Sequence, residues 1–188
     1  MKVLLFLFIA IPLLLVIGVV AIYNSLIRLT NQAKNAWANI DVQLKRRHDL
    51  IPNLVEVVKG YAKHEREVFE NITRARSAAM QAKGVGALAE AESVLTRALG
   101  QLRLVVEAYP ELKASQNFLA LQEELASTEN KIAFARQFYN DSVMFLNTKL
   151  QSFPSNLVAG MFRFQPLEYF ELDDARARAV PNADFGVS

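Results

Sequence analysis

The chain has 188 residues, a formal net charge of +2 and no cysteine, and 52% of its residues are apolar. That length suits one domain, and the apolar share is high for a soluble protein of this size. Without cysteine, disulfides, thiolate metal sites and lipoprotein attachment are excluded. A net charge so close to zero also argues against the broad basic face that nucleic acid requires, so no nucleic-acid partner is expected.

Most of the apolar excess lies in the run VLLFLFIAIPLLLVIGVVAI, from Val3 to Ile22. This uncharged run would form a helix of about 30 Å, the thickness of a bilayer's hydrocarbon core. A cleaved signal peptide is the alternative, because Lys2 precedes the run and residues 19–21 resemble a cleavage site. Signal h-regions are shorter, at about 7–15 residues. We therefore expect residues 1–22 to be a retained membrane anchor.

The charges that flank this span give a weak orientation signal. Lys2 precedes the span, whereas Arg28 and Lys34 follow it within a short distance. Because cytoplasmic flanks carry the excess of lysine and arginine, the counts lean towards a cytoplasmic C-terminal domain. A signal anchor with its N-terminus in the cytoplasm is the alternative.

Beyond the anchor, apolar residues recur at helical spacing. Residues 24–83 predict one amphipathic helix or two in series, and the KGVG turn at 83–86 ends this stretch. Residues 87–109 predict the next helix, after which Pro110 can begin another. A seam with alternating steps of four and three predicts a long helix over residues 118–153.

No strand pattern of useful length accompanies these helices, so the predicted fold class is all-α. We expect a single N-terminal transmembrane helix followed by an antiparallel four-helix bundle of the up-and-down type. The expected domains are the anchor at 1–22 and the bundle at 23–153. An aromatic-rich segment at 154–172 would pack on the bundle or lie in the membrane interface, and a disordered tail is expected at 173–188.

Pro52 leaves one architectural question open. It interrupts an apolar phase that runs unbroken from Leu44 to Val58, and it removes the helical hydrogen bond to the carbonyl of His48. The proline must therefore kink one long helix or open a new helix with Asp49 as N-cap. The unbroken phase favours the kink, whereas four helices of matched length favour the turn.

Four runs carry a more specific signal: YNSLIRLTNQAKNAWANIDVQLKRRHDLIPNLVEVVKGYAKHE, ITRAR, YPELKASQNFLALQEELASTENKIAFARQFYN and FPSNLVAGMFRFQPLEYFE. Together, over residues 23–171, they resemble the LemA family of bacterial membrane-anchored proteins. The resemblance implies a short N-terminal anchor and a four-helix bundle at the bacterial inner membrane, with the N-terminus outside the cell. It implies no established enzymatic activity, cofactor or ligand. Some magnetosome membrane proteins resemble the same family, which is compatible with a membrane-organising role.

The chain offers no recognisable catalytic or metal site. His48 and His64 are its two histidines, and neither has the glutamate three residues earlier that di-metal helix bundles use. Neither a Gly-x-Ser-x-Gly elbow nor a phosphate-binding loop is present. We therefore expect no catalytic residue, cofactor or metal, and no enzyme.

The basic run at Lys45, Arg46 and Arg47 is a candidate interaction surface. A continuous helix would place it about 33 Å beyond the membrane edge, where salt screening over about 8 Å removes any attraction to lipid. The run is then a solvated face or pairs with acidic residues such as Glu123 and Glu124. The candidate interaction surface also includes aromatic residues after the bundle: Phe162, Phe164, Tyr169 and Phe170.

Polar residues beside the apolar seam predict contacts between helices. A buried polar group costs about 1–3 kcal/mol unless it is hydrogen-bonded, so interior polar groups should pair and fix the register. We hypothesise that Glu129 and Arg136 form an interhelical network with Arg74 or Arg76. The alternative is that these residues lie in water at the helix flanks.

Two classes of function remain. The first is a membrane-anchored scaffold or adaptor whose partners are the membrane, through residues 3–22, and other membrane or membrane-associated proteins; a homo-oligomer is also left open. The second is an enzyme or small-ligand binder with a polar pocket between the helices. The absence of a catalytic constellation favours the scaffold.

Overall fold

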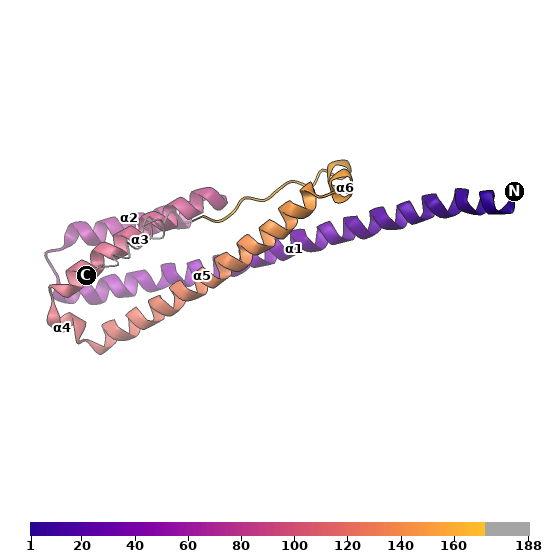
Figure 1. The fold of residues 1–188 in the computed structure, drawn as a ribbon. Helices are drawn as coiled ribbons and strands as arrows, with labels where there is room; N and C mark the ends of the chain where they lie inside the picture. The colour runs from indigo at the N-terminus through magenta and orange to yellow at the C-terminus, as the bar shows by residue number, and fades with distance from the viewer. Residues whose placement is uncertain (172–188) are drawn as a thin grey trace, which may run out of the picture. The chain divides into compact units, whose positions relative to one another are not determined.

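The computed structural model describes residues 1–171 of the chain. Within them the chain is helical and contains no strand, which confirms the predicted all-α class. The helices are α1 (Lys2–Tyr61), α2 (Arg66–Gln81), α3 (Val85–Glu107), α4 (Pro110–Lys113), α5 (Gln116–Gln151) and α6 (Ser155–Met161) (Figure 1). The disordered tail expected at 173–188 lies outside the described residues.

The chain divides into two units, which we describe separately. Among the described residues, unit 1 contains Met1–Arg47 and Ala126–Tyr169, and unit 2 contains His48–Leu125 together with Phe170 and Glu171. Helices α1 and α5 contribute to both units. The predicted boundary between anchor and bundle, after residue 22, falls inside α1, which crosses it without a break.

Helix α1 also continues through Pro52, so the alternative in which Asp49 caps a new helix is wrong. The chain instead turns at residues 62–65, after the Ala62 amide has donated to the Val58 carbonyl at 2.9 Å. The sequence from Lys63 to Glu67 is wholly polar and supplies no buried side chain. A helix continued through this stretch would gain no apolar contact, so the turn forms here despite the proline ten residues earlier.

Unit 2 is an up-and-down bundle of four main segments, which are residues 48–61 of α1, α2, α3 and residues 116–125 of α5, with the short α4 between the last two. Near the first turn, Lys59 Nζ lies 5.9 Å from the centre of the Phe69 ring, whereas Arg76 reaches back to His48, so α1 and α2 are antiparallel. Gly84, with φ of +89°, allows the tight turn between α2 and α3 that the KGVG run predicts. The side chains of Ile51, Val58, Ile72, Leu95, Leu102, Leu112 and Phe118 form much of the buried core.

Unit 1 is built on the antiparallel pairing of α1 with α5. Leu26 shares a buried cluster with Leu146, the ring of Trp37 lies 5.2 Å from that of Tyr139, and Arg47 contacts Glu129. The residue numbers rise along α1 as they fall along α5, which fixes the antiparallel direction. Helix α6 and the segment at 162–169 then pack against this pair.

The N-terminal part of α1 has the character of the predicted anchor. Among the described residues, α1 is the one helix long and apolar enough to cross a membrane. Apart from Ala10, which is partly buried, the side chains from Phe8 to Ile17 are exposed, and Gly18 and Val19 are partly buried. Because an exposed apolar surface of this length is unfavourable in water, this part of α1 suits a membrane environment.

Candidate functional site

The four residues of the predicted polar network have separate surroundings. Arg76 belongs to unit 2, where its Nε donates to the carbonyl of His48 at 2.7 Å. Glu129 belongs to unit 1, where its Oε1 lies 3.5 Å from Nη2 of Arg47. Arg74 is exposed and Arg136 is half-buried. Each of these two contacts joins helices, but a network among Arg74, Arg76, Glu129 and Arg136 stays a prediction.

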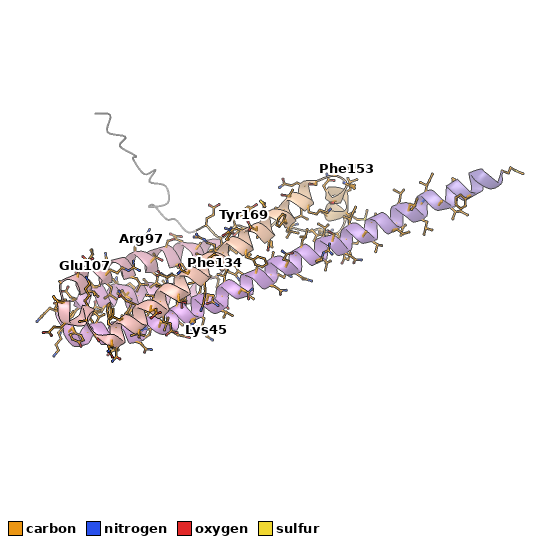
Figure 2. All side chains as sticks on the ribbon, turned by 60° about the horizontal axis from the view of Figure 1, so that its bottom comes forward. Lys45, Arg97, Glu107, Phe134, Phe153 and Tyr169 are labelled. Atoms are coloured by element: carbon orange, nitrogen blue, oxygen red, sulfur yellow. The ribbon has the colours of Figure 1, made fainter. Side chains whose placement is uncertain are left out.

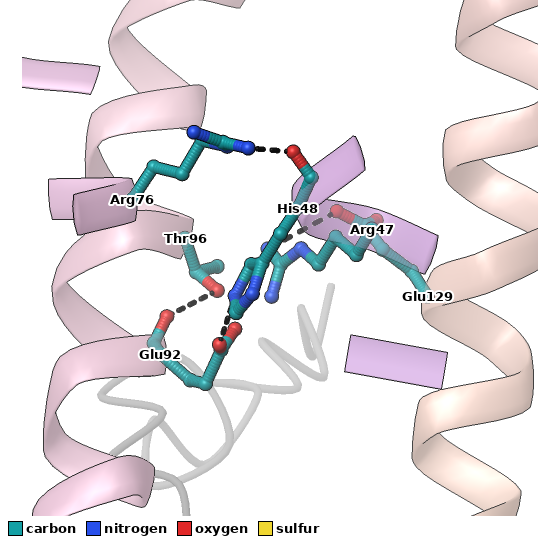
Figure 3. A network of polar contacts seen from close by, with 6 residues as sticks. All are labelled: Arg47, His48, Arg76, Glu92, Thr96 and Glu129. Atoms are coloured by element: carbon teal, nitrogen blue, oxygen red, sulfur yellow. Dashed lines mark hydrogen bonds and ion pairs between the residues drawn. The ribbon is translucent and has the colours of Figure 1, made fainter. Parts of the chain in front are cut away.

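The Arg76 contact compensates for Pro52. Proline has no amide hydrogen, so the carbonyl of His48, four residues earlier, lacks its normal helical donor. The guanidinium of Arg76 supplies a charged donor to that oxygen from the neighbouring helix α2. This contact explains how an uninterrupted α1 accommodates a proline in its interior, and Figure 3 shows it.

A buried pair in unit 2 was not predicted. His48 Nε2 lies 2.6 Å from Glu92 Oε1, and the two residues are 6% and 1% exposed (Figure 3). Glu92 follows Ala89 and precedes Leu95 by three residues, so it occupies a core-facing position of α3. This spacing from two apolar residues is the sequence feature that could have predicted the burial of Glu92. The pair ties α1 to α3, and a carboxylate this deeply buried depends on such a partner.

The predicted interaction surface is only partly a surface. Lys45 and Arg46 are exposed, whereas Arg47 is buried and contacts Glu129; the expected pairing of the basic run with Glu123 or Glu124 stays a prediction. Among the aromatic residues, Phe162 and Tyr169 are exposed and Phe164 is half-buried. Phe170 is 0% exposed, so it packs in the interior and offers no surface for a partner.

The segment after α6 is fastened to α5 in unit 1. The Tyr139 hydroxyl donates to the carbonyl of Glu168 at 2.8 Å. The side-chain carboxamide of Asn147 makes two hydrogen bonds to the backbone of Leu167. Its Nδ2 donates to the Leu167 carbonyl at 2.9 Å, and its Oδ1 accepts from the Leu167 backbone N–H at 3.0 Å. Burial raises the pKa of Tyr139, and the negative charge of Glu168 raises it further.

An aromatic stripe is the main exposed feature of α5 in unit 1. We use this name for Phe134, Phe138 and Phe145, which are 73%, 50% and 54% exposed. Steps of four and seven residues place them on one side of the helix, and Figure 2 shows Phe134 on the surface. The sequence seam through Tyr139, Val143 and Leu146 identified the buried side of α5, but not this exposed side.

The stripe borders an open groove between α1 and α5, with a volume of about 550 Å³. Polar side chains of α1, mostly with amide groups, form most of its lining, and Phe138 lines it from α5. The lining residues are Asn24, Ile27, Arg28, Asn31, Gln32, Asn35 and Phe138. None of the predicted network residues lines it. Among the described residues, no group of three or more acidic or histidine side chains could hold a metal ion.

The sequence of the chain is similar to those of several bacterial proteins. The chain is similar to magnetosome protein MamQ 2 of Paramagnetospirillum magneticum and to magnetosome protein MamQ of Magnetospirillum gryphiswaldense. Each is 25% identical to it over 79% of this chain and 64% of the relative. The chain thus spans a little less than two thirds of these relatives' length. It is also 28% identical to protein LemA of Metamycoplasma hominis, over 88% of this chain and 74% of that protein.

The family model described as LemA family matches residues 36–185. The match covers most of the chain, including the α1 region around Pro52 and the whole of α2, α3 and α5. It confirms the resemblance inferred from the sequence runs. The apolar start of α1 and the magnetosome relatives together support membrane association. The chain belongs to the LemA family.

Proposed function

We propose that this protein is a single-pass scaffold of the bacterial inner membrane that holds partner proteins beside the membrane. The observation that carries the proposal is the aromatic stripe of Phe134, Phe138 and Phe145 on α5. Contiguous exposed aromatic residues on a helix are unfavourable in water and favour a protein contact. Aromatic side chains are also the residues that contribute most binding energy in protein interfaces.

The stripe and its neighbouring groove fit an amphipathic helix of a partner protein. Phe134 and Phe145 are eleven residues apart, which is about 16 Å or three helical turns. Asn31 and Asn35 line the groove beside Phe138. A partner helix laid there would bury apolar residues on the phenylalanines and place polar residues against the amides.

The anchor places this surface near the membrane. Residues 3–22 would cross the bilayer with the N-terminus outside, and the rest of the chain would lie in the cytoplasm. Arg28 and Lys34 after the span support this direction, because basic flanks remain on the cytoplasmic side. The similarity to proteins named as magnetosome proteins supports a role at a membrane.

A small-ligand binder is the second candidate, and the groove is the observation that favours it. Asn24, Asn31 and Asn35 offer amide donors and acceptors, and Arg28 adds a positive charge. The groove is open, whereas small-molecule sites usually enclose most of the ligand. The scaffold therefore remains the better supported function.

Photocrosslinking in intact cells tests the scaffold. We would place benzoylphenylalanine at position 134, 138 or 145 of the full chain, one at a time, and at Gln101 as a control. Gln101 is exposed on α3, outside unit 1. The proposal predicts that the three stripe positions crosslink to the same discrete protein, and that the control does not.

A matched substitution completes the test. Replacing Phe134 and Phe145 with serine should abolish the crosslink from position 138 while the protein stays in the membrane fraction. Equal crosslinking at Gln101, or no discrete product at any stripe position, would contradict the scaffold. A product with twice the mass of the chain would assign the stripe to self-association.

A further inference from the structure

The outward side of α6 is made of apolar residues. Phe153, just before the helix, and Leu157 and Met161 within it are 80%, 62% and 71% exposed. Pro154 and Gly160 are exposed on the same side. The inward side consists of residues buried in unit 1: Ser155, Val158 and Ala159. We call the exposed set of Phe153, Leu157, Met161 and Phe162 the α6 face.

The sequence around this face contains no charge. From Leu150 to Phe162 every residue is neutral, whereas Lys149 and Arg163 flank the run on its two sides. Exposed protein surface normally mixes charges among its apolar residues. An uncharged segment with exposed apolar residues, between two basic residues, is typical of a segment at a lipid surface, where the basic side chains reach the headgroups.

Contacts place α6 beside the end of the predicted span. Val158 and Ala159 share a cluster with Leu26, and Val19 and Ile22 of the span pack against it. The ring centre of Phe162 lies 4.7 Å from that of Tyr23, the first residue after the span. In Figure 1 the indigo start of α1 extends beyond α6. The α6 face therefore lies beside the end of the predicted span.

We propose that the α6 face lies in the membrane interface and contacts lipid directly. It is then a second membrane contact, independent of the partner surface on α5 and additional to the α1 span. Aromatic rings are favoured at the headgroup level, which suits Tyr23, Phe153 and Phe162. Because α6 follows α5 directly, this contact would hold unit 1 at a fixed tilt to the membrane.

Lipid is the occupant that the position of the face favours. The inward side of α6 packs on Val19 and Ile22 of the predicted span, so the exposed α6 face lies beside the exposed apolar start of α1. A helix that lies in the interface needs one apolar side and little else, and α6 provides that. A protein partner or a second copy would have to reach the same surface at the membrane edge, in competition with lipid that is always present.

The absence of cysteine from the chain makes a direct test simple, because one introduced cysteine carries one label. We would substitute Leu157→Cys or Met161→Cys in the full chain, attach a nitrobenzoxadiazole dye, and insert one copy per phosphatidylethanolamine/phosphatidylglycerol nanodisc. Phe138→Cys is the matched control, because it is also an exposed apolar position of unit 1. Quenching is measured with doxyl groups placed near the headgroup or near the chain end of the lipid.

The proposal predicts severalfold stronger quenching at 157 and 161 than at 138, and stronger quenching by the shallow doxyl group than by the deep one. A dye at position 157 could also be quenched because it lies near the α1 span, even if the α6 face itself did not enter the lipid. In the Leu157→Cys background, Met161→Asp with Phe162→Asp should therefore reduce quenching severalfold, whereas Asn156→Asp should not. Circular dichroism checks that each variant keeps its helix content.

Three results would overturn the proposal. The first is equal quenching at 157 and 138. The second is quenching that survives the two aspartates at 161 and 162, because the apolar face would then be irrelevant. The third is a dye at 157 that the doxyl lipids do not quench and that is shielded from water only when several copies share a nanodisc. In that case the face would bind another copy of the chain.

Discussion

Tyr139 should make the stability of the folded protein depend on pH. Its hydroxyl donates to the Glu168 carbonyl, and burial together with the Glu168 charge raises its pKa above the ordinary value of 10.0. A raised pKa means that the folded protein holds the proton more tightly than the unfolded chain. The resulting stability is present below pH 10 and is lost as the pH rises through the folded pKa.

Tyr139→Phe should therefore lower the free energy of unfolding at neutral pH by about 1 kcal/mol, the net value of one hydrogen bond. Above pH 10 the difference from the wild type should shrink, because phenylalanine has no proton to lose. Urea unfolding of both proteins in detergent, from pH 7 to pH 11, measures this. Tyr169→Phe, at an exposed tyrosine, is the control and should follow the wild-type curve. A constant difference across the range would rule out the linkage.

Removing one partner of the His48–Glu92 pair should lower the free energy of unfolding strongly, whereas replacing both partners with apolar residues should lower it little. His48→Leu removes the imidazole from a carboxylate that is 1% exposed, and such a change is expected to cost about 3–5 kcal/mol. His48→Leu with Glu92→Leu should recover most of that loss, because apolar residues of similar volume often substitute for buried pairs. Thermal unfolding of the three proteins decides this. A double variant no more stable than His48→Leu alone would contradict this expectation.

At the level of the helices, Arg76 and Pro52 should be energetically coupled. Arg76→Ala removes the donor to the His48 carbonyl and should cost about 1.5–3 kcal/mol, as for other hydrogen bonds to charged groups. In a Pro52→Ala background the backbone amide can donate to that carbonyl again, so the same substitution should cost distinctly less. A double-mutant cycle measures the coupling. Arg74→Ala, on the same helix but exposed, serves as control, and additive effects of Arg76 and Pro52 would contradict the coupling.

Much of the helix layout follows from the sequence, since apolar spacing predicted α3 and α5 closely and the KGVG turn separated α2 from α3. The end of α1 at Tyr61 could not be predicted in the same way, because Pro52 is the stronger helix-breaking signal in that stretch. The His48 carbonyl that the proline leaves without a helical donor accepts from Arg76, 24 residues after the proline, and local sequence does not reveal such a contact. Glu92 was missed for a similar reason: charge suggests exposure, whereas its place between Ala89 and Leu95 indicates the core.

At the scale of the whole molecule, two buried cores share two continuous helices. The core of unit 1 contains Leu26 and Leu146, and the core of unit 2 contains residues such as Ile51 and Leu95. The sequence predicted one bundle over residues 23–153 because an apolar seam shows which side of a helix is buried, but not which partners cover each part. Because α1 and α5 run through both units, the two units could unfold cooperatively or separately.

We expect the two units to open separately. Leu146→Ala should destabilise unit 1, and Leu95→Ala should destabilise unit 2, each by about 2–5 kcal/mol, because both leucines are almost fully buried. Hydrogen exchange of the full chain in nanodiscs reports protection along the sequence. Leu146→Ala should speed exchange in α6 and residues 126–151 while α2 and α3 stay protected, and Leu95→Ala should do the reverse. If either substitution lowered protection equally in both cores, α1 and α5 would transmit the loss and the protein would be one cooperative body.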